Sequence, residues 1–444
     1  MVDLFAFDIN SIPLKENSKV DGIRLAFHKK DITQALVAAK KIIASGYSLF
    51  LQPMVTKNYN EIEFISLVKH ANALKVYAFY IVDSFGSMSL EELRNYTDMA
   101  DKYLDKEIKL GYHSHNNMQL AFSNAIDLCS RQLDRSLIID SSIYGMGRGA
   151  GNLNTELIAD YLNMHKKYKY EVMPLLEVID EILAYYFKKK PWGFSLSQYL
   201  SASLDCHPNY ASYLIDKKTT YISDIKQVLS KLPIENKNSF NRQIADDLYK
   251  EFLFVDKSKP KGQFNISTNN KILLIASGSS VREHLTLFKE KVIDSETQII
   301  ALNHKPQFEC DFYFFSNQQR FDKFTNQLPL NKQVITTNIR SKNLLDTVIS
   351  LKEIAFIEQS FVTNVALLMI NYLIMNQIKE VEIAGLDGYQ KNRNNYVYDD
   401  TNVIANEDLF EEINKAISKS LQQLNKSINI HLITPSIFEK HILS

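Results

Sequence analysis

The chain has 444 residues, of which 51 are basic, 51 are acidic and 45% are hydrophobic. This length and composition indicate two or three domains with large buried cores, and the balance of charges argues against a dedicated nucleic-acid-binding surface. Cys129, Cys206 and Cys310 are widely separated and form no CxxC pair, which excludes a disulfide framework and fits a reducing compartment.

The ends and apolar runs of the chain predict a cytoplasmic protein without a membrane span. The first residues, MVDLFAFD, carry acids where a signal peptide needs bases. The most apolar stretch, residues 361–375, is shorter than the roughly 20 residues that cross a bilayer. We therefore expect it to form a buried helix.

The first half of the sequence alternates strand-like and helix-like segments. Strands are expected at 2–8, 22–27, 47–53, 76–82, 109–115 and 136–140, and helices at 32–45, 59–73, 89–103, 118–130 and 154–166. Repeated βα units of this length predict parallel strands with helical crossovers. Six strands are found, whereas a complete (β/α) barrel has eight.

The second half predicts a helical region and then another α/β domain. Residues 171–255 are mostly helical, and residues 256–270 have the polar, lysine-rich composition of a linker. Further strands are expected from Lys271 and at 298–302, 311–315, 333–337, 353–357, 380–384 and 428–433. The predicted domains are 1–170 (partial barrel), 171–255 (helical extension completing it), 256–270 (linker) and 271–444 (Rossmann-like open α/β domain).

The histidines of the segment GYHSHNN are the first candidate site. His113 and His115 alternate on a strand, so they face the same side, about 7 Å apart along the strand. Two converging imidazoles are suited to a divalent metal. The alternative is a pair of hydrogen-bonded polar residues at the end of a strand.

Two other predicted strands end in polar segments, VDSFG at residues 82–86 and a glycine-rich loop at residues 140–152. In a parallel barrel, the carboxyl ends of the strands form the active face. Ser84 lies in the first segment, and Tyr144, Arg148 and Asn152 lie in the second. Turn formation or a structural role is the alternative for each.

The segments VDSFG, GYHSHNN and GMGRGAGN, followed by LNTEL, resemble the metal-dependent pyruvate aldolase and lyase superfamily, and above all its 4-hydroxy-2-oxovalerate aldolase branch. The resemblance covers roughly residues 1–215 and implies a TIM-type barrel. It implies that His113, His115 and Asn152 hold Mg²⁺, Mn²⁺, Co²⁺ or Zn²⁺, which polarises a 2-oxo acid. It also places Ser84 near the keto acid and Tyr144 and Arg148 within reach of the substrate.

The sequence departs from that family in one respect. The first strand of the family carries an Arg-Asp pair followed by Gly, and no such segment precedes Val20. Because residues 1–10 and 22–27 resemble the second and third strands of the family, Arg24 is not the missing arginine. We therefore expect a barrel that lacks its first βα unit, with a metal-ligand set short of one aspartate.

Small and polar residues follow the predicted strands of the second domain. Gly278 and Ser279 lie in a turn before a helix, and Asn303 and Asp387 follow later strands. This arrangement suits a phosphate-bearing ligand, with His304 as a candidate base; a structural domain with a vestigial cleft is the alternative. The domain loosely resembles the hydroxymethylpterin diphosphokinase-like and sialyltransferase-like families, which implies a nucleotide or nucleotide sugar.

Together these features predict a divalent-metal-dependent aldolase acting on a 2-oxo acid and an aldehyde. The aldolase would be fused to a nucleotide-binding domain and would serve in surface polysaccharide biosynthesis. The resemblance also implies a homodimer. The alternative is an incomplete barrel that acts as a scaffold, with glycosyl- or phosphotransferase activity, or ligand binding only, in the C-terminal domain.

Overall fold

The computed structural model describes residues 1–217, 219–267, 270–288, 294, 296–355, 364–391, 393–398 and 407–442. The chain divides into two compact units. Unit 1 consists of Met1–Ser212 and Pro233–Phe240, and unit 2 of Tyr213–Leu232 and Asn241–Ser444. The region expected as one helical extension is thus shared between the units, and the domain limits expected from the sequence stay a prediction.

Unit 1 contains a parallel six-stranded sheet in the order β1-β2-β3-β4-β5-β6. Its strands are β1 (Val2–Asp3), β2 (Gly22–Phe27), β3 (Ser48–Pro53), β4 (Ala78–Asp83), β5 (Lys109–Ser114) and β6 (Leu137–Ile139). The helices between them are α1 (Ile32–Ala44), α2 (Glu61–Leu74), α3 (Leu90–Tyr103), α4 (Ala121–Ser130) and α5 (Thr155–Lys166). The fold class expected from the βα alternation, α/β with a TIM-type parallel sheet, is confirmed, although β1 is much shorter than the expected strand 2–8.

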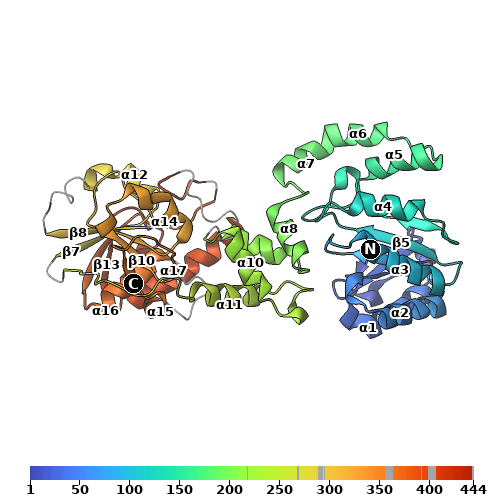
Figure 1. The fold of residues 1–444 in the computed structure, drawn as a ribbon, viewed down its shortest axis with the longest axis horizontal. Helices are drawn as coiled ribbons and strands as arrows, with labels where there is room; N and C mark the ends of the chain where they lie inside the picture. Colours follow the sequence, from blue (N-terminus) through green and yellow to red (C-terminus); the bar gives the residue numbers. More distant parts are fainter. Residues whose placement is uncertain are drawn as a thin grey trace. The chain divides into compact units, whose positions relative to one another are not determined.

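One face of this sheet carries the main core of unit 1. Figure 1 shows α1 to α4 side by side along the sheet, and their apolar faces pack on strand residues such as Leu25, Leu51 and Leu110. α2 and α3 begin with capping boxes. The side chains of Asn60 and Ser89 accept from the backbone N–H groups of Glu63 and Glu92, and the carboxylates of these glutamates accept from the backbone N–H groups of Asn60 and Ser89. The crossovers are therefore fixed locally as well as by packing.

Several helices follow the sheet of unit 1. They are α6 (Met173–Val178), the π-helical turn η6 (Ile179–Leu183), α7 (Ala184–Lys189), α8 (Leu196–Ser203) and α9 (Asn209–Asp216), whose last residues belong to unit 2. None of the helices that the structure describes combines the length and hydrophobicity that a bilayer span requires.

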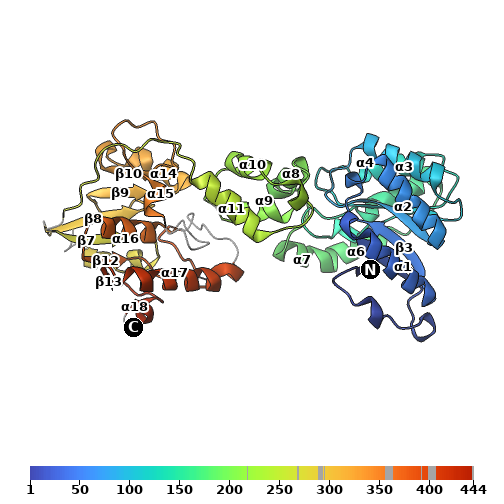
Figure 2. The ribbon, with the colours of Figure 1, turned by 90° about the horizontal axis from the view of Figure 1, so that it is seen from below.

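Unit 2 holds a parallel seven-stranded sheet in the order β11-β10-β9-β8-β7-β12-β13. Its strands are β7 (Lys271–Ile275), β8 (Thr297–Leu302), β9 (Phe312–Phe315), β10 (Gln333–Thr336), β11 (Thr347–Ile349), β12 (Glu380–Ala384) and β13 (Asn429–Leu432). Its helices are α10 (Ile222–Ser230), α11 (Arg242–Leu253), α12 (Ser280–Glu283), α14 (Gln318–Phe324), α15 (Leu351–Ile354), α16 (Val365–Met375), α17 (Phe410–Leu424) and α18 (Glu439–Ile442). Figures 1 and 2 show α15, α16 and α17 gathered beside this sheet.

The order of the strands creates a switch point between β7 and β12, from which the chain connections run outward in opposite directions. The buried helix expected at 361–375 is α16, with six buried residues, while residues 361–363 lie outside the described residues. The strand expected at 353–357 is wrong. Residues 351–354 form the helical turn α15, residues 356 and 357 lie outside the described residues, and the edge strand is β11.

Candidate functional site

A polar network on the inner side of the unit 1 sheet centres on Asp140, directly after β6. Arg24 on β2 donates to both carboxylate oxygens of Asp140, at 2.5 and 2.7 Å, and the Tyr80 hydroxyl on β4 donates to Oδ1 at 3.2 Å. Since β2 and β6 are separated by three strands in the sheet, the direct contact of Arg24 with Asp140 shows that the sheet curls as in a barrel.

The same carboxylate orients His113 on β5. Its Nδ1 lies 3.0 Å from Asp140 Oδ2. Burial favours the neutral form of Asp140, but hydrogen bonds and positive charge from His113 and Arg24 outweigh it and lower the pKa of this carboxyl. Because an ionised carboxylate only accepts hydrogen bonds, Nδ1 of His113 is the donor in this contact, which leaves Nε2 as the ring nitrogen available to a metal.

His115 follows β5 and lies beside His113. The ring centroids are 5.6 Å apart, so the expectation that the two side chains share one face holds in the structure. Burial, with smaller effects of His113 and Arg148, lowers the pKa of His115 to about 4. The imidazole is therefore neutral at pH 7, the form in which histidine binds a metal.

Asn152 belongs to the glycine-rich loop, which brings it next to His115. The loop is joined to the end of β5 by a bridge between His115 and Asn152 and by a hydrogen bond from Asn116 N to Gly151 O of 3.0 Å. Asn152 Nδ2 donates to Met146 O, but its Oδ1 is buried without a hydrogen-bond partner. A buried acceptor without a partner is costly unless a ligand completes it.

Glycine is required in this loop by close backbone contact. Gly151 has a φ of +75°, and a Cβ there would lie 2.3 Å from Gly145 O. A Cβ on Gly147 would lie 2.5 Å from Asn152 Nδ2. The spacing of the glycines thus determines where Asn152 can lie.

Two imidazoles and an amide oxygen are suitable ligands for a divalent cation such as Zn²⁺, Co²⁺ or Mn²⁺. Across the residues that the structure describes, no group of three His, Cys, Asp or Glu side chains is arranged to hold a metal ion. The unpaired Oδ1 of Asn152 nevertheless fits the predicted set of His113, His115 and Asn152. Such a set leaves coordination positions for oxygen atoms of a substrate.

A cavity of about 200 Å³ opens beside His115. It is lined by Ser84, His115, Asn117, Arg148, Gly149, Gln198, Pro208, Asn209 and Ser212. Three of the predicted residues, Ser84, His115 and Arg148, therefore meet at one cavity. Gln198 on α8 closes one wall and accepts a hydrogen bond of 3.1 Å from Asn117.

Ser84 and Tyr144 also have structural roles. Ser84 Oγ accepts from the N–H of Val55 at 2.9 Å, which holds this β-branched residue at a φ of +52°. Tyr144 packs against Phe187 and Trp192, and its carbonyl accepts from Trp192 Nε1 at 2.8 Å. The position of Tyr144 thus indicates that it anchors the glycine-rich loop.

In unit 2, Gly278, Ser279 and Asp387 come together at the switch point. Asp387 accepts from Ser280 N at 2.8 Å, Ser280 Oγ at 2.5 Å and Ser279 Oγ at 3.4 Å. A Cβ on Gly278 would lie 2.6 Å from Asp387 Cγ. Burial raises the pKa of Asp387 against the opposing effect of these donors.

Asn303 and His304 follow the neighbouring strand β8. Asn303 Oδ1 accepts from Ser316 N at 2.9 Å, so it ties two strand ends together. His304 is fully buried, with Nδ1 3.0 Å from Leu302 O and Nε2 without a partner. Burial lowers its pKa to about 4.

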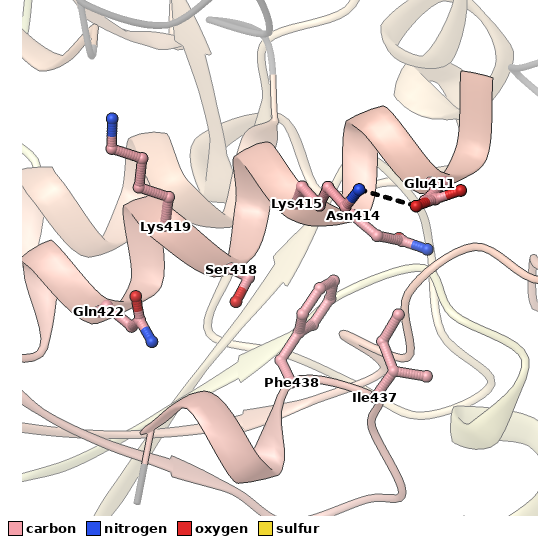
Figure 3. A pocket seen from close by; sticks show the side chains of 8 residues that line it. All are labelled: Glu411, Asn414, Lys415, Ser418, Lys419, Gln422, Ile437 and Phe438. Atoms are coloured by element: carbon pink, nitrogen blue, oxygen red, sulfur yellow. Dashed lines mark ion pairs between the residues drawn. The ribbon is translucent and has the colours of Figure 1, made fainter. Parts of the chain in front are cut away.

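A surface pocket of about 430 Å³ lies elsewhere in unit 2, between α17 and the segment before α18 (Figure 3). It is lined by Glu411, Asn414, Lys415, Ser418, Lys419, Gln422, Ile437 and Phe438, and Glu411 and Lys415 form an ion pair of 2.7 Å. None of the residues predicted for the second domain lines this pocket.

Residues 22–180 match the model of the HMGL-like family. Among curated relatives, 4-hydroxy-2-oxovalerate aldolase of Bacillus thuringiensis (strain Al Hakam) is 31% identical over 122 residues, covering 27% of this chain and 34% of the relative. Oxaloacetate decarboxylase of Mycobacterium tuberculosis (strain ATCC 25618 / H37Rv) is 23% identical over 139 residues, covering 31% and 40%. The crystal structure of the N-terminal domain of a proposed aldolase from Bacteroides vulgatus is 28% identical and covers 48% of this chain and 71% of that one, with a TM-score of 0.42.

Residues 22–180 of this chain are therefore similar to the pyruvate aldolase and HMGL-like superfamily, which its motifs predicted. The alignment spans about a third of the length of the first 4-hydroxy-2-oxovalerate aldolases. The resemblance of the second domain to nucleotide-dependent families stays a prediction.

Sequence reasoning missed Asp140, Tyr80 and Gln198 as site residues. One feature of the sequence could have indicated Asp140. It ends the predicted strand next to the strand of His113 and His115, and the side chains of an active site lie at the carboxyl ends of the strands in a parallel barrel. The sequence indicated only that Arg24 is not the arginine of the first strand of the family. In the structure, Arg24 pairs with Asp140.

Proposed function

We propose that unit 1 is a divalent-metal-dependent carbon–carbon lyase acting on a 2-oxo acid. The observations that support this proposal are the 5.6 Å between the ring centroids of His113 and His115, the bridge between His115 and Asn152, and the Oδ1 of Asn152 that has no hydrogen-bond partner. A cation held by these three side chains would supply Lewis-acid polarisation of the carboxylate and keto oxygens of the substrate.

The residues that line the cavity would bind and orient the substrate. Arg148 gives the cavity a positive charge, which attracts an acidic substrate. Because Ser84 Oγ accepts from Val55 N, its own O–H is available to donate to a substrate oxygen. Gln198 and the 208–212 segment close the cavity, which limits access of water to the reacting carbons.

An aldol cleavage that releases pyruvate is the particular reaction we propose. Decarboxylation of a 2-oxo diacid is the alternative, since relatives of both kinds match this part of the chain. Both reactions place negative charge on the carbon next to a keto group, so one site would suit either.

The test is pyruvate release from 4-hydroxy-2-oxo acids and from oxaloacetate, after EDTA treatment and addition of Mg²⁺, Mn²⁺, Co²⁺ or Zn²⁺ in turn. We expect the double variant His113→Ala, His115→Ala to lose metal binding and activity by more than about 100-fold. The control is His70→Ala, an exposed histidine of α2. Unchanged metal content and pyruvate release in the double variant would refute the proposal.

For unit 2 we propose binding of a nucleotide or nucleotide sugar by Gly278, Ser279, Asn303 and Asp387, with glycosyl- or phosphotransferase activity as the associated function. Its support is the position of Ser279 and Asp387 at the switch point between β7 and β12. Calorimetry with CMP, UDP and ADP tests it, and the absence of binding by all three would oppose it. A role in surface polysaccharide biosynthesis stays a prediction that depends on this ligand.

A further inference from the structure

A second cavity of unit 1, of about 440 Å³, lies where β2 and β3 end. His28 directly follows β2 and Met54 directly follows β3, and residues from the segment 235–239 form the opposite wall. All of its lining residues belong to unit 1. Since the carboxyl ends of parallel strands share one edge of a sheet, the cavity lies on the same edge as Ser84 and His115.

The second cavity and the candidate lyase site are neighbours. Val55 lines the second cavity, and its N–H donates to Oγ of Ser84, which lines the cavity beside His115. On the opposite side, the Tyr210 hydroxyl shares its hydrogen bond between the carbonyl oxygens of Asn236 and Ser239, at 3.1 Å each. This contact fixes the segment 235–239 to the segment 208–212, which lines the cavity beside His115.

The charged groups of the second cavity balance one another. Nζ of Lys29 forms an ion pair with Glu63 at 2.6 Å. Burial lowers the pKa of His28 below its usual 6.5, so the imidazole is neutral at pH 7. The other ionisable side chains of the lining, Lys30 and Glu235, have opposite charges. A lining without a net charge favours an uncharged polar ligand over a phosphate or a carboxylate.

Two joined amides present free hydrogen-bonding groups in this cavity. Asn58 Nδ2 donates to Asn238 Oδ1 at 2.7 Å. Among the described residues, Asn58 Oδ1, Asn238 Nδ2 and Ser239 Oγ have no hydrogen-bond partner. Because a hydroxyl group both donates and accepts, two neighbouring hydroxyl groups match a free acceptor beside a free donor. Met54 and Val55 add apolar surface for a carbon chain.

We propose that the second cavity binds the far end of the substrate, and that this end is a carbon chain with several hydroxyl groups. The inference rests on the lyase activity proposed above and specifies the class of its aldehyde product, a polyhydroxylated aldehyde. The end of β2 lies two strands from the end of β4, roughly 10 Å away across the sheet. At about 1.3 Å per bond, a 2-oxo acid of about six to eight carbons covers this distance.

The chemistry of the cleavage is compatible with a tail that is held throughout. The bond between C3 and C4 of the 4-hydroxy-2-oxo acid breaks, and C3 keeps the electron pair and takes up a proton to give pyruvate. The hydroxyl group on C4 loses its proton and becomes the aldehyde. The carbons from C5 onward do not change, so their hydroxyl groups can stay bound to Asn58 and Asn238.

The experiment compares pyruvate release by the full chain from substrates that differ only in the tail. They are 4,5,6-trihydroxy-2-oxohexanoate, tested as each stereoisomer, the same acid phosphorylated at C6, and 4-hydroxy-2-oxohexanoate. We expect kcat/KM to be at least about tenfold higher for the trihydroxy acid than for the acid without hydroxyl groups at C5 and C6, mainly through a lower KM, because two further hydrogen bonds form.

The double variant Asn58→Leu, Asn238→Leu removes both amides at similar volume. It should lose the preference for the trihydroxy acid and keep kcat/KM for 4-hydroxy-2-oxohexanoate within about twofold, which also shows that it is folded. The control is Asn95→Leu, an exposed asparagine of α3, which should keep the preference.

A second measurement does not depend on turnover. In titrations of the metal-free chain followed by nuclear magnetic resonance, ribitol should bind at least about tenfold more tightly than 1,5-pentanediol, which has the same number of carbons but lacks the three inner hydroxyl groups. The double variant should bind the two compounds equally.

Four results would overturn this inference and leave the lyase activity in place. They are equal kcat/KM for the trihydroxy acid and 4-hydroxy-2-oxohexanoate, a preference that the double variant keeps, equal binding of ribitol and 1,5-pentanediol by the wild type, and a preference for the phosphorylated acid over the trihydroxy acid. The last result would mean that charge, through Lys30, recognises the tail. Pyruvate release from none of the acids would instead refute the lyase activity, and with it the assignment of this cavity to a substrate.

Discussion

Both units place polar side chains at the carboxyl ends of parallel strands. The two units differ in how far apart in the sheet the strands lie whose side chains form hydrogen bonds with one another. In unit 1, Asp140 after β6 contacts Arg24 on β2, although three strands lie between them. In unit 2, Asp387 after β12 contacts Ser279 and Ser280 after the adjacent strand β7. The comparison shows that a curled sheet gathers residues from distant strands, whereas here the open sheet joins neighbours.

The two arrangements also leave different groups without a partner. In unit 1, the unpaired Oδ1 belongs to Asn152, which forms a bridge with His115, a residue that lines a cavity. In unit 2, Nε2 of His304 is fully buried. An unpaired group beside a cavity is suited to binding, and an unpaired group within the core acts mainly on stability.

The largest expected effect comes from Asp140→Asn, which breaks the connection across the sheet of unit 1. Without the carboxylate, His113 is no longer held with Nε2 free, and we expect metal affinity to fall about 10- to 100-fold. Arg24 loses its ion pair, which should lower the free energy of unfolding by about 2 kcal/mol, given its partial exposure. Metal titration by calorimetry and urea denaturation measure the two effects.

The matched control for that variant is Asp134→Asn, which removes an exposed ion pair with Lys106 of 3.0 Å. We expect no measurable change there in metal affinity or in the free energy of unfolding, because exposed ion pairs contribute little to stability. Equal losses of metal affinity in both variants would show that Asp140 does not orient His113.

The next largest effect is a pH dependence of the free energy of unfolding of unit 2, which we expect to arise from His304. The pKa of His304 is lowered to about 4 in the folded chain, so the folded state binds fewer protons than the unfolded state between pH 6.5 and 4. The contribution of buried, neutral His304 to the free energy of unfolding is therefore fully present above pH 6.5. It is lost as the pH falls, and at pH 5 the free energy of unfolding is lower by about 2 kcal/mol. In His304→Leu, the free energy of unfolding of unit 2 should fall less steeply over this range, as denaturation at several pH values will measure. An equally steep fall would contradict the prediction.

A smaller effect is expected from Asp387→Asn at the switch point of unit 2. The amide group replaces one acceptor oxygen with a donor, so either the N–H of Ser280 loses its acceptor or the Ser280 hydroxyl has to accept from residue 387 instead of donating to it. We expect a loss of about 1.5 kcal/mol in the free energy of unfolding and unchanged metal binding by unit 1. A change in that metal binding would mean that the two sites are coupled.

The smallest effect is expected from Tyr80→Phe, which removes the longest hydrogen bond to Asp140, of 3.2 Å. Because Arg24 and His113 still hold the carboxylate, stability should fall by about 1 kcal/mol or less, with metal affinity unchanged within about twofold. A loss as large as that of Asp140→Asn would show that Tyr80 is essential to the network. Denaturation and calorimetry under the same conditions allow the comparison.

Much of the fold could be predicted from the sequence, because the signals are local. The bounds of β2 and β12 match the expected strands, since apolar residues predominate in GIRLAF and EVEIA and Gly385 ends the second strand. The exceptions are short edge elements. β11 has only three residues, and the Leu351–Ile354 turn beside it is capped by Ser350, so the apolar run favoured a strand in the wrong place.

The sequence by itself determined the βα alternation, the parallel sheets and the motifs that identify the superfamily, because each is carried by the order of neighbouring residues. His113 and His115 could be paired from their spacing on one strand. Only the tertiary structure decided that Asp140 holds His113 and that Arg24, 116 residues away, holds Asp140. The physical reason is the curl of the sheet, which results from packing of helices and strands over the whole unit and is not a property of any single segment.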